Sequence, residues 1–364
     1  QYAIADGCTL KAIASVKDDY NALAPNYEIK ITNYESAHNL NGQFDFIILD
    51  EAHCLGAYPR PSKRTEQVKS ICSNSPVLYL SGTPTPESYS QLYHQLWVCD
   101  RSPFSRFVNF YKWAKDGYVD VRQKKVNGYS INDYSRANSV KITEAVKHLF
   151  LSYSQEDAGF SCNIVERELP CHMSWETRSL IRDLKRKRIL ELTDGSVVLG
   201  DTPAKLMSKL HQLSGGTVIA EDDTHLIVDE SKALRIHDVF HGKKIAIFYV
   251  YKSELDLLCS VFPEWTDSPE EFQHSEDKIF ISQVRKAREG VRLDSAEAIV
   301  FYNLEYSYLS YEQGKNRIMS KERTAPAPVY FAISDCGIDG DILEAVRSKK
   351  DFTASYYAKK YGKF

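Results

Sequence analysis

The fold is decided by two stretches, Phe44-Asp-Phe-Ile-Ile-Leu-Asp-Glu-Ala-His53 and Leu78-Tyr-Leu-Ser-Gly-Thr-Pro84. Each is a short apolar run that ends abruptly in polar residues. Apolar runs of this length are typical of buried parallel strands. Polar groups at the carboxyl end of such strands lie where open α/β sheets bind ligands. The two stretches therefore predict strands of one parallel sheet with a ligand site at their carboxyl ends.

The first strand delivers two adjacent carboxylates, Asp50 and Glu51, to that site. In nucleotide hydrolysis one carboxylate holds Mg²⁺ and the next activates or orients the attacking water. The sequence Asp50-Glu-Ala-His53 alone would also suit the start of a helix, where acidic residues are favoured. Ser81 and Thr83 would likewise suit a helix cap or a turn. The preceding strand, together with the second strand that ends at Ser81, favours the nucleotide interpretation.

Composition bounds the class of protein. The 364 residues are 43% hydrophobic and 26% charged, which suits two ordinary domains with real cores. The net charge of −3 gives no global signal for nucleic acid, so such a surface must be local. The eight cysteines include no Cys-x-x-Cys pair, which argues against a zinc ribbon and suits a reducing cytosol. Without a signal peptide or an apolar run near 18 residues, we expect a cytoplasmic protein with no membrane partner.

Strands and helices are expected to alternate in two blocks, which favours parallel sheets with crossover helices. In the first block, strands are expected at 28–35, at 44–49 and in the run into Ser81, with helices at 10–23, 63–73 and 87–97. In the second block, strands are expected at 244–251, 278–283, 298–303 and 329–334, with an exposed connection at 265–277 and a closing helix at 339–350. A long helix is expected at 174–192. We predict three segments: a first lobe at 1–98, an irregular and helical insertion at 99–204, and a second lobe at 205–364.

The order of short motifs along nearly the whole chain resembles a known family, the Swi/Snf-type branch of superfamily 2 helicase-like ATPases, and especially its small phage-encoded members. Asp50-Glu-Ala-His53 resembles motif II, the DEAH box, and Ser81-Gly-Thr83 resembles motif III. The remaining motifs follow the same order, with motif Ib at 33–35, a lead into the second lobe at 205–213, motif V at 282–291, motif VI at 310–318 and the final helix at 337–350.

The resemblance implies an α/β protein of two RecA-like (P-loop NTPase type) lobes with parallel sheets. It implies a nucleic-acid-dependent ATPase that uses ATP and Mg²⁺ and moves along double-stranded DNA, as a monomer, in the host cytoplasm if the chain is phage-encoded. The implied roles are Mg²⁺ binding for Asp50, water activation for Glu51, coupling for His53, Ser81, Gly82 and Thr83, backbone approach at the nucleotide cleft for Gly290, and nucleotide contact from the second lobe for Gln313 and Arg317.

Motif VI departs from the family pattern. The family has a second arginine three residues after the first, and Ser320 occupies that position here, followed by Lys321 and Arg323. A guanidinium that reaches across the cleft stabilises charge on the γ-phosphoryl oxygens, and lysine lacks its planar fork. Arg317 and Arg323 therefore both stay open as the arginine finger.

A phosphate loop of the form Gly-x-x-x-x-Gly-Lys-[Ser/Thr] does not occur in the sequence. Such a loop cradles the phosphates with backbone N–H groups and supplies a lysine. The chain begins with Gln1, not Met, and in the family the loop lies upstream of the segment that matches 8–12. We therefore expect a first lobe that is truncated before the loop, and little ATP hydrolysis by this chain alone.

Nucleic-acid contacts are expected at several places. Segment 101–126 interleaves basic residues, including Arg106 and Lys112, with aromatic residues. Basic side chains contact phosphates, whereas the aromatic side chains either stack on bases or pack a small core. Lys185-Arg-Lys-Arg188 is more typical of a solvated helix face. By resemblance, Thr9, Lys11, Asn33 and Ser282 are further candidates for contact with the nucleic-acid backbone.

Two other functions remain open. One is a helicase that separates strands, and the other is a DNA-binding scaffold that no longer hydrolyses ATP.

Overall fold

The computed structural model describes residues 2–6, 21, 26–40, 42–86, 88–126, 129–152, 157, 159–287 and 291–348, and of residues 2–6, 124–126 and 129 it describes the backbone only. The chain divides into two compact units, Gln1–Ser152 and Tyr153–Phe364. Each unit is described by itself below.

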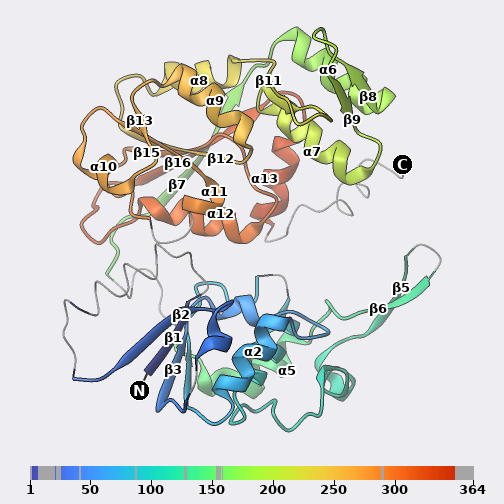
Figure 1. Cartoon of the computed structure of the whole chain (residues 1–364), viewed down its shortest axis with the longest axis vertical. Helices are drawn as coiled ribbons and strands as arrows, with labels where there is room; N and C mark the ends of the chain where they lie inside the picture. The colour runs from blue at the N-terminus through green and yellow to red at the C-terminus, as the bar shows by residue number, and fades with distance from the viewer. Residues whose placement is uncertain are drawn as a thin grey trace. The chain divides into compact units, whose positions relative to one another are not determined.

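The first unit is built on a parallel sheet with the strand order β2-β1-β3-β4 (Figure 1). Its strands are β1 (Tyr2–Asp6), β2 (Ile29–Asn33), β3 (Phe46–Leu49) and β4 (Val77–Tyr79). A separate antiparallel hairpin pairs β5 (Arg122–Val126) with β6 (Tyr129–Asp133). Its helices are α2 (Lys63–Cys72), α3 (Leu92–Trp97), α4 (Phe110–Trp113) and α5 (Ser139–Val146). The strands predicted from the two apolar runs are thus present, and β3 and β4 are neighbours.

The aromatic residues of segment 101–126 form a core of their own. Phe104, Phe110 and Trp113 are at most 1% exposed and pack with residues of α3 and α5. Of the two roles left open by the sequence, packing is therefore the one these three rings perform. Tyr111 is 37% exposed, so it is the ring of this group that solvent reaches most.

The second unit contains a six-stranded sheet in the order β13-β14-β12-β15-β16-β7, and every strand pair in it is parallel. Its strands are β7 (Ile164–Cys171), β12 (Ile245–Tyr249), β13 (Trp265–Thr266), β14 (Ile279–Gln283), β15 (Ala298–Phe301) and β16 (Ala327–Ser334). The short hairpins pair β8 (Ile189–Glu191) with β9 (Val197–Leu199) and β10 (Thr217–Ile219) with β11 (His225–Ile227). Its helices are α6 (Trp175–Lys187), α7 (Pro203–Ser214), α8 (Ser231–Val239), α9 (Lys252–Val261), α10 (Pro269–His274), α11 (Val284–Ala287), α12 (Tyr308–Lys315) and α13 (Asp339–Arg347).

Helices cover both faces of this sheet (Figure 1). Along β12, Ile245 and Ile247 pack into one core with α8 and α9, whereas Ala246 and Phe248 pack into the other with α7, α12 and α13. Side chains alternate between the two faces of a strand, and both faces here are apolar because both are covered. The α/β fold class with parallel sheets, as RecA-like lobes have, is confirmed.

Four details differ from the sequence expectation. The helix expected at 174–192 ends at Lys187, because Arg188 has a left-handed conformation and the strand β8 follows it. The segment 99–204, expected as an insertion, is divided between the two compact units at 152/153. Its strand β7 was not predicted, yet it forms an edge of the second sheet beside β16. The segment 265–277 contains β13 and α10 and not merely an exposed connection, because Phe272 is fully buried against the core.

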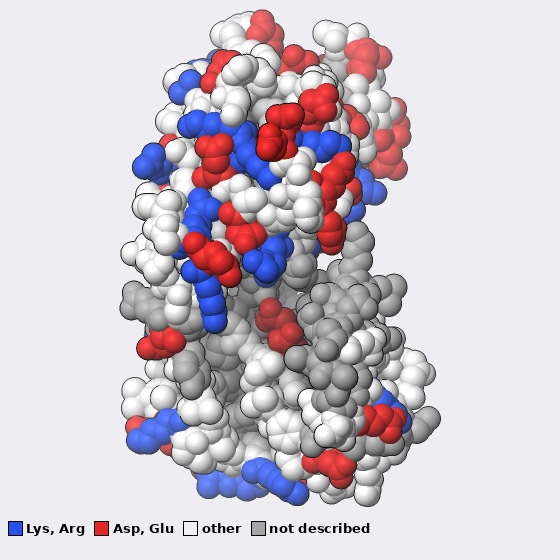
Figure 2. Space-filling view, turned by 90° about the vertical axis from the view of Figure 1, so that its left-hand side faces the viewer, with Lys and Arg blue, Asp and Glu red and all other residues white. Residues whose placement is uncertain are grey.

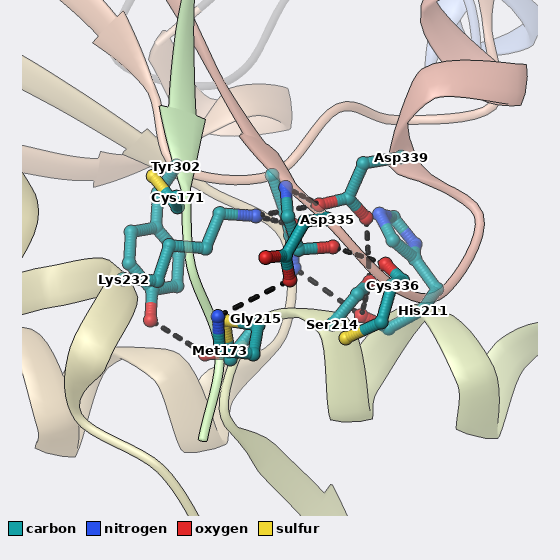
Figure 3. A network of polar contacts seen from close by, with 12 residues as sticks. Cys171, Met173, His211, Ser214, Gly215, Lys232, Tyr302, Asp335, Cys336 and Asp339 are labelled. Carbon is teal, nitrogen blue, oxygen red and sulfur yellow. Dashed lines mark hydrogen bonds and ion pairs between the residues drawn. The ribbon is translucent and has the colours of Figure 1, made fainter. Parts of the chain in front are cut away.

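A buried polar network joins the carboxyl ends of β15 and β16 to the helices of the second unit (Figure 3). The Lys232 side chain on α8 has no exposed surface, and its Nζ lies 2.9 Å from Asp339 Oδ2 and 2.8 Å from Asn303 Oδ1. Asp339 also accepts hydrogen bonds from the Ser334 N–H and from the Ser214 hydroxyl of α7. Burial would raise the pKa of Asp339, but Lys232 holds it below its usual range, so the carboxylate is ionised.

Gly337 lets the chain turn into this network. Its φ is +86°, and a Cβ at this position would lie 2.6 Å from Ser214 Cβ, which is too close for any side chain. The glycine therefore brings the start of α13, and with it Asp339, against the end of α7.

We predict that Lys232→Met strongly destabilises the second unit, because it leaves a buried carboxylate without its partner. Losses of this kind are about 3–5 kcal/mol. Hydrogen exchange of the β12 and β15 amides measures the change within this unit. Lys205→Met is the control, since Lys205 is exposed and its ion pairs with Asp201 and Glu221 contribute little to stability, so that exchange should stay unchanged. Equal effects of the two substitutions would contradict a structural role for the buried pair.

Candidate functional site

The polar residues that follow β3 and β4 are brought together by backbone hydrogen bonds. Leu49 is the register partner of Tyr79. Beyond the strands, the Leu80 N–H donates to Leu49 O over 2.9 Å, and the Ala52 N–H donates to Leu80 O over 2.9 Å. Asp50 and Ser81 therefore follow these strands at the same edge of the sheet, as the sequence predicts.

Asp50 and Glu51 are fixed by their neighbours. The Glu51 N–H donates to Asp50 Oδ1 over 2.9 Å. The hydroxyl of Tyr34, a fully buried residue just after β2, donates to Asp50 O over 2.6 Å. Tyr34 was not among the predicted site residues, although its place directly after Asn33 at a strand end was a usable signal.

Glu51 has an unusual backbone conformation, with φ 48° and ψ 45° in the left-handed region. This region is uncommon for residues other than glycine and costs on the order of 1–3 kcal/mol. Strained residues of this kind cluster at functional sites. The turn also directs Glu51 toward His53 in the short 3₁₀ helix Ala52–Leu55.

His53 connects the two polar stretches. Its Nδ1 lies 3.1 Å from Glu51 Oε2 and 3.1 Å from Ser81 Oγ, and the residue is 7% exposed. Burial would lower the pKa of His53, but hydrogen bonds to Cys54 and Glu51 outweigh this effect and raise the pKa to about 9. At neutral pH His53 is therefore charged and is bonded to a carboxylate.

The turn after β4 completes the group. Ser81 Oγ accepts a hydrogen bond from the Thr83 N–H over 3.2 Å. Gly82 between them is open: a Cβ added there would meet no atom within 4 Å among the residues that the structure describes. A continuous path of contacts thus runs from Asp50 through Glu51, His53 and Ser81 to the Thr83 backbone.

Asp50 suits a magnesium ion. It is a half-buried carboxylate at a strand end, and oxygen ligands are those that Mg²⁺ prefers. Among the described residues there is no group of three or more His, Cys, Asp or Glu side chains that could hold a metal. Mg²⁺ is usually held by one or two carboxylates together with waters and phosphates of the substrate.

In the second unit, Gln313 lies on α12 and Arg317 in the 3₁₀ turn Asn316–Ile318 that follows it. The Leu293 N–H donates to Arg317 O over 3.0 Å and fixes this turn. Arg323 is occupied within the unit, because its Nη1 donates to Asp294 O over 3.1 Å and to Ala296 O over 2.9 Å.

The nucleic-acid candidates are in different environments. Arg106 and Lys112 are exposed, and Arg106 Nη2 donates to the Tyr118 hydroxyl over 3.2 Å. Asn33 Oδ1 accepts from the Ser36 N–H over 2.8 Å, and Ser282 is only 6% exposed on β14. Thr9, Lys11 and Gly290 lie outside the described residues.

Charges are mixed on the face of the second unit that Figure 2 shows, where Lys and Arg side chains are interspersed with Asp and Glu side chains. Such a surface gives a mixed field and not a field of one sign. Among the helices in the described part of the chain, none is both long and apolar enough to cross a membrane.

Comparison with known proteins gives a family match over more than half of the chain: a family described as SNF2-related domain matches residues 6–213. A curated relative, "Putative protein p41" of Acyrthosiphon pisum secondary endosymbiont phage 1, is 21% identical over 335 residues, which cover 84% of this chain and 70% of the relative. A solved structure, "Crystal structure of the C-terminal part of Fun30 ATPase domain", is similar with a TM-score of 0.40 and 11% identity over 55% of this chain and 96% of that chain.

We predict that His53 titrates near pH 9, which is measurable by NMR of its ring Cε1–H. The stability that the raised pKa of His53 contributes should be fully present below about pH 6.5, the ordinary value, and should be lost as the pH rises through about 9. Glu51→Gln removes the carboxylate and should lower the pKa of His53. A midpoint at or below 6.5 in the unsubstituted protein would contradict the proposed ion pair.

Proposed function

This chain belongs to the SNF2-related domain family, and we propose that it is a DNA-dependent ATPase that moves along double-stranded DNA. The family consists of Swi/Snf-type ATPases of superfamily 2. The observation that carries the proposal is the path of contacts from Asp50 and Glu51 through His53 to Ser81. Motifs II and III of this family are expected to meet in this way.

Asp50 would hold the Mg²⁺ of a bound nucleotide, and the ion would neutralise charge on the transferred phosphoryl group. Glu51 would orient or activate the attacking water. Its strained turn and its contact with charged His53 restrict where the carboxylate points. A carboxylate held in one orientation loses little entropy when it meets its water, which favours the reaction.

His53 would link hydrolysis to movement. Its Nδ1 lies 3.1 Å from Glu51 Oε2 and 3.1 Å from Ser81 Oγ. A displacement of Glu51 would therefore displace His53 and, through it, the turn after β4. Ser81, Gly82 and Thr83 form this turn, and the open space at Gly82 leaves it free to change conformation. Coupling through packed and hydrogen-bonded groups of this kind needs no long path.

Gln313 and Arg317 of the second unit would contact the nucleotide when the units close, and Arg317 would stabilise charge that develops on the γ-phosphoryl oxygens. Arg323 is the alternative finger, and its guanidinium would first have to leave the two backbone carbonyls that it bonds. Gly290 would let the backbone approach at the same cleft.

Duplex DNA would be bound through its phosphates. Arg106 and Lys112 are exposed and suit such contacts. Thr9, Lys11 and Asn33 would add contacts from the first unit, and Ser282 would act from the end of β14, where burial leaves it little surface for a phosphate. Phosphate contacts need no separated bases, which favours translocation over unwinding.

We predict that Glu51→Gln keeps nucleotide binding and lowers turnover by about 10²–10⁴-fold, the usual contribution of a positioned base. Phosphate release with DNA present is measured on the product of the complete reading frame. The 364 residues alone should hydrolyse ATP slowly, since they contain no phosphate-loop sequence. Turnover that survives Glu51→Gln would remove Glu51 from catalysis. An unsubstituted protein that binds DNA but hydrolyses no ATP would favour the scaffold.

We predict that the same product displaces a third strand from a triplex in an ATP-dependent manner but does not separate a forked duplex. The first assay reports movement along intact duplex and the second reports strand separation. Binding should weaken steeply with salt, because released counterions drive phosphate contacts. Fork separation without triplex displacement would overturn the translocase proposal in favour of a helicase.

A further inference from the structure

Glu166 on the edge strand β7 of the second unit forms hydrogen bonds with α12, the helix that contains Gln313. Glu166 Oε1 accepts from the Tyr311 hydroxyl over 2.6 Å and from Lys315 Nζ over 3.1 Å. Glu166 Oε2 lies 3.3 Å from Arg347 Nε of α13. One side chain on the strand therefore bonds two helices, and two of its three partners lie on α12, on either side of Gln313.

The position of α12 depends on such contacts because the helix is weak by itself. It has eight residues, fewer than an isolated helix needs. Gly314 near its end lowers helix propensity by roughly 1 kcal/mol relative to alanine. This glycine is required, because a Cβ there would lie 2.9 Å from Phe301 Cζ of the sheet. The helix can therefore approach the sheet closely, but it needs tertiary contacts to stay in place.

The charges of this group are mutually stabilised. Burial would raise the pKa of Glu166, but Tyr311 and Lys315 hold it below its usual range, so the carboxylate is ionised. Burial and the neighbouring carboxylate raise the pKa of Tyr311, so its hydroxyl stays protonated and donates a hydrogen bond to Glu166. The carboxylate is half-buried, and salt screens such a group less than it screens an exposed pair.

Glu168, on the same face of β7, contacts α13 but not α12. Glu168 follows Glu166 by two residues, so both side chains lie on one face of the strand. Glu168 pairs with Arg347 of α13, and 52% of the Glu168 side chain is exposed. Glu168 thus shares the strand, the charge and one helix with Glu166, but its contact is to α13 and not to α12.

We infer that Glu166 is a positioning residue: it holds α12 so that Gln313 and the turn with Arg317 are presented to the nucleotide. This inference rests on the proposed function. The strand that begins the second unit would then determine where the candidate finger lies. Lys315 is two residues from Arg317, so displacement of α12 moves the finger directly.

The test compares Glu166→Ala with Glu168→Ala in the product of the complete reading frame. Glu166→Ala should lower kcat by about 10–10²-fold, as expected for a small displacement of a reacting group. The KM for ATP and the salt dependence of DNA binding should change little. Glu168→Ala should keep kcat. Lys315→Met removes one bond to α12 and should give an intermediate loss, which keeps the test valid if Glu166→Ala unfolds.

A second measurement does not depend on hydrolysis. Fluorotyrosine incorporated in the protein gives a ¹⁹F resonance for Tyr311, assigned with Tyr311→Phe. Glu166→Ala should shift this resonance, and Glu168→Ala should not. An unsubstituted protein without ATPase activity would refute the proposed function and leave this contact in place. A hydrolysing protein whose kcat is equal in Glu166→Ala and Glu168→Ala would overturn the inference.

Discussion

The second unit depends on one buried charge pair, Lys232 with Asp339. Removing two charges from water is costly, and only close partners and further hydrogen bonds repay that cost. Here the partners come from five places: α7, α8, the end of β15, the end of β16 and the start of α13. None of these elements can shift without leaving a charge unsatisfied. The pair therefore fixes the carboxyl edge of the sheet more firmly than apolar packing would, since apolar contacts have no preferred direction.

That edge determines the surroundings of α12. Asn303, a partner of Lys232, lies five residues before α12, and Asp339 begins the helix α13 whose Arg347 meets Glu166. The region that carries Gln313 and Arg317 is thus held on both sides. In the first unit, hydrogen bonds at the ends of β3 and β4 have the corresponding role for Asp50 and Ser81.

The central strands and the grouping of Asp50 and Glu51 with Ser81 could be predicted from sequence. Buried parallel strands are continuous apolar runs, and the polar residues after them fall at one edge. The strand β7 could not be predicted in this way. Glu166, Arg167 and Glu168 look like a solvated segment, and the partners of Glu166 and Glu168 lie on distant helices that give no local signal. Packing alone decided the role of Phe104, Phe110 and Trp113, because aromatic residues suit both a core and base stacking. The hydrogen bonds from Arg323 to two backbone carbonyls could not be predicted from the sequence either.

The strand order of the second unit also constrains the sequence of events during synthesis. β7 is the first strand of this sheet to be made, but its neighbour β16 is the last: Arg167 pairs with Tyr330, 163 residues later. Lys232 likewise waits for Asp339, which follows 107 residues later. In the first unit, β3 and β4 are separated by only one α-helix. Long-range pairings form slowly because a long loop must close first. During synthesis, the first unit would therefore be able to fold while β7 and Lys232 of the second unit still had no partners. A partly made second unit of this kind is prone to aggregate, so we expect chaperones to bind the chain mainly during this interval.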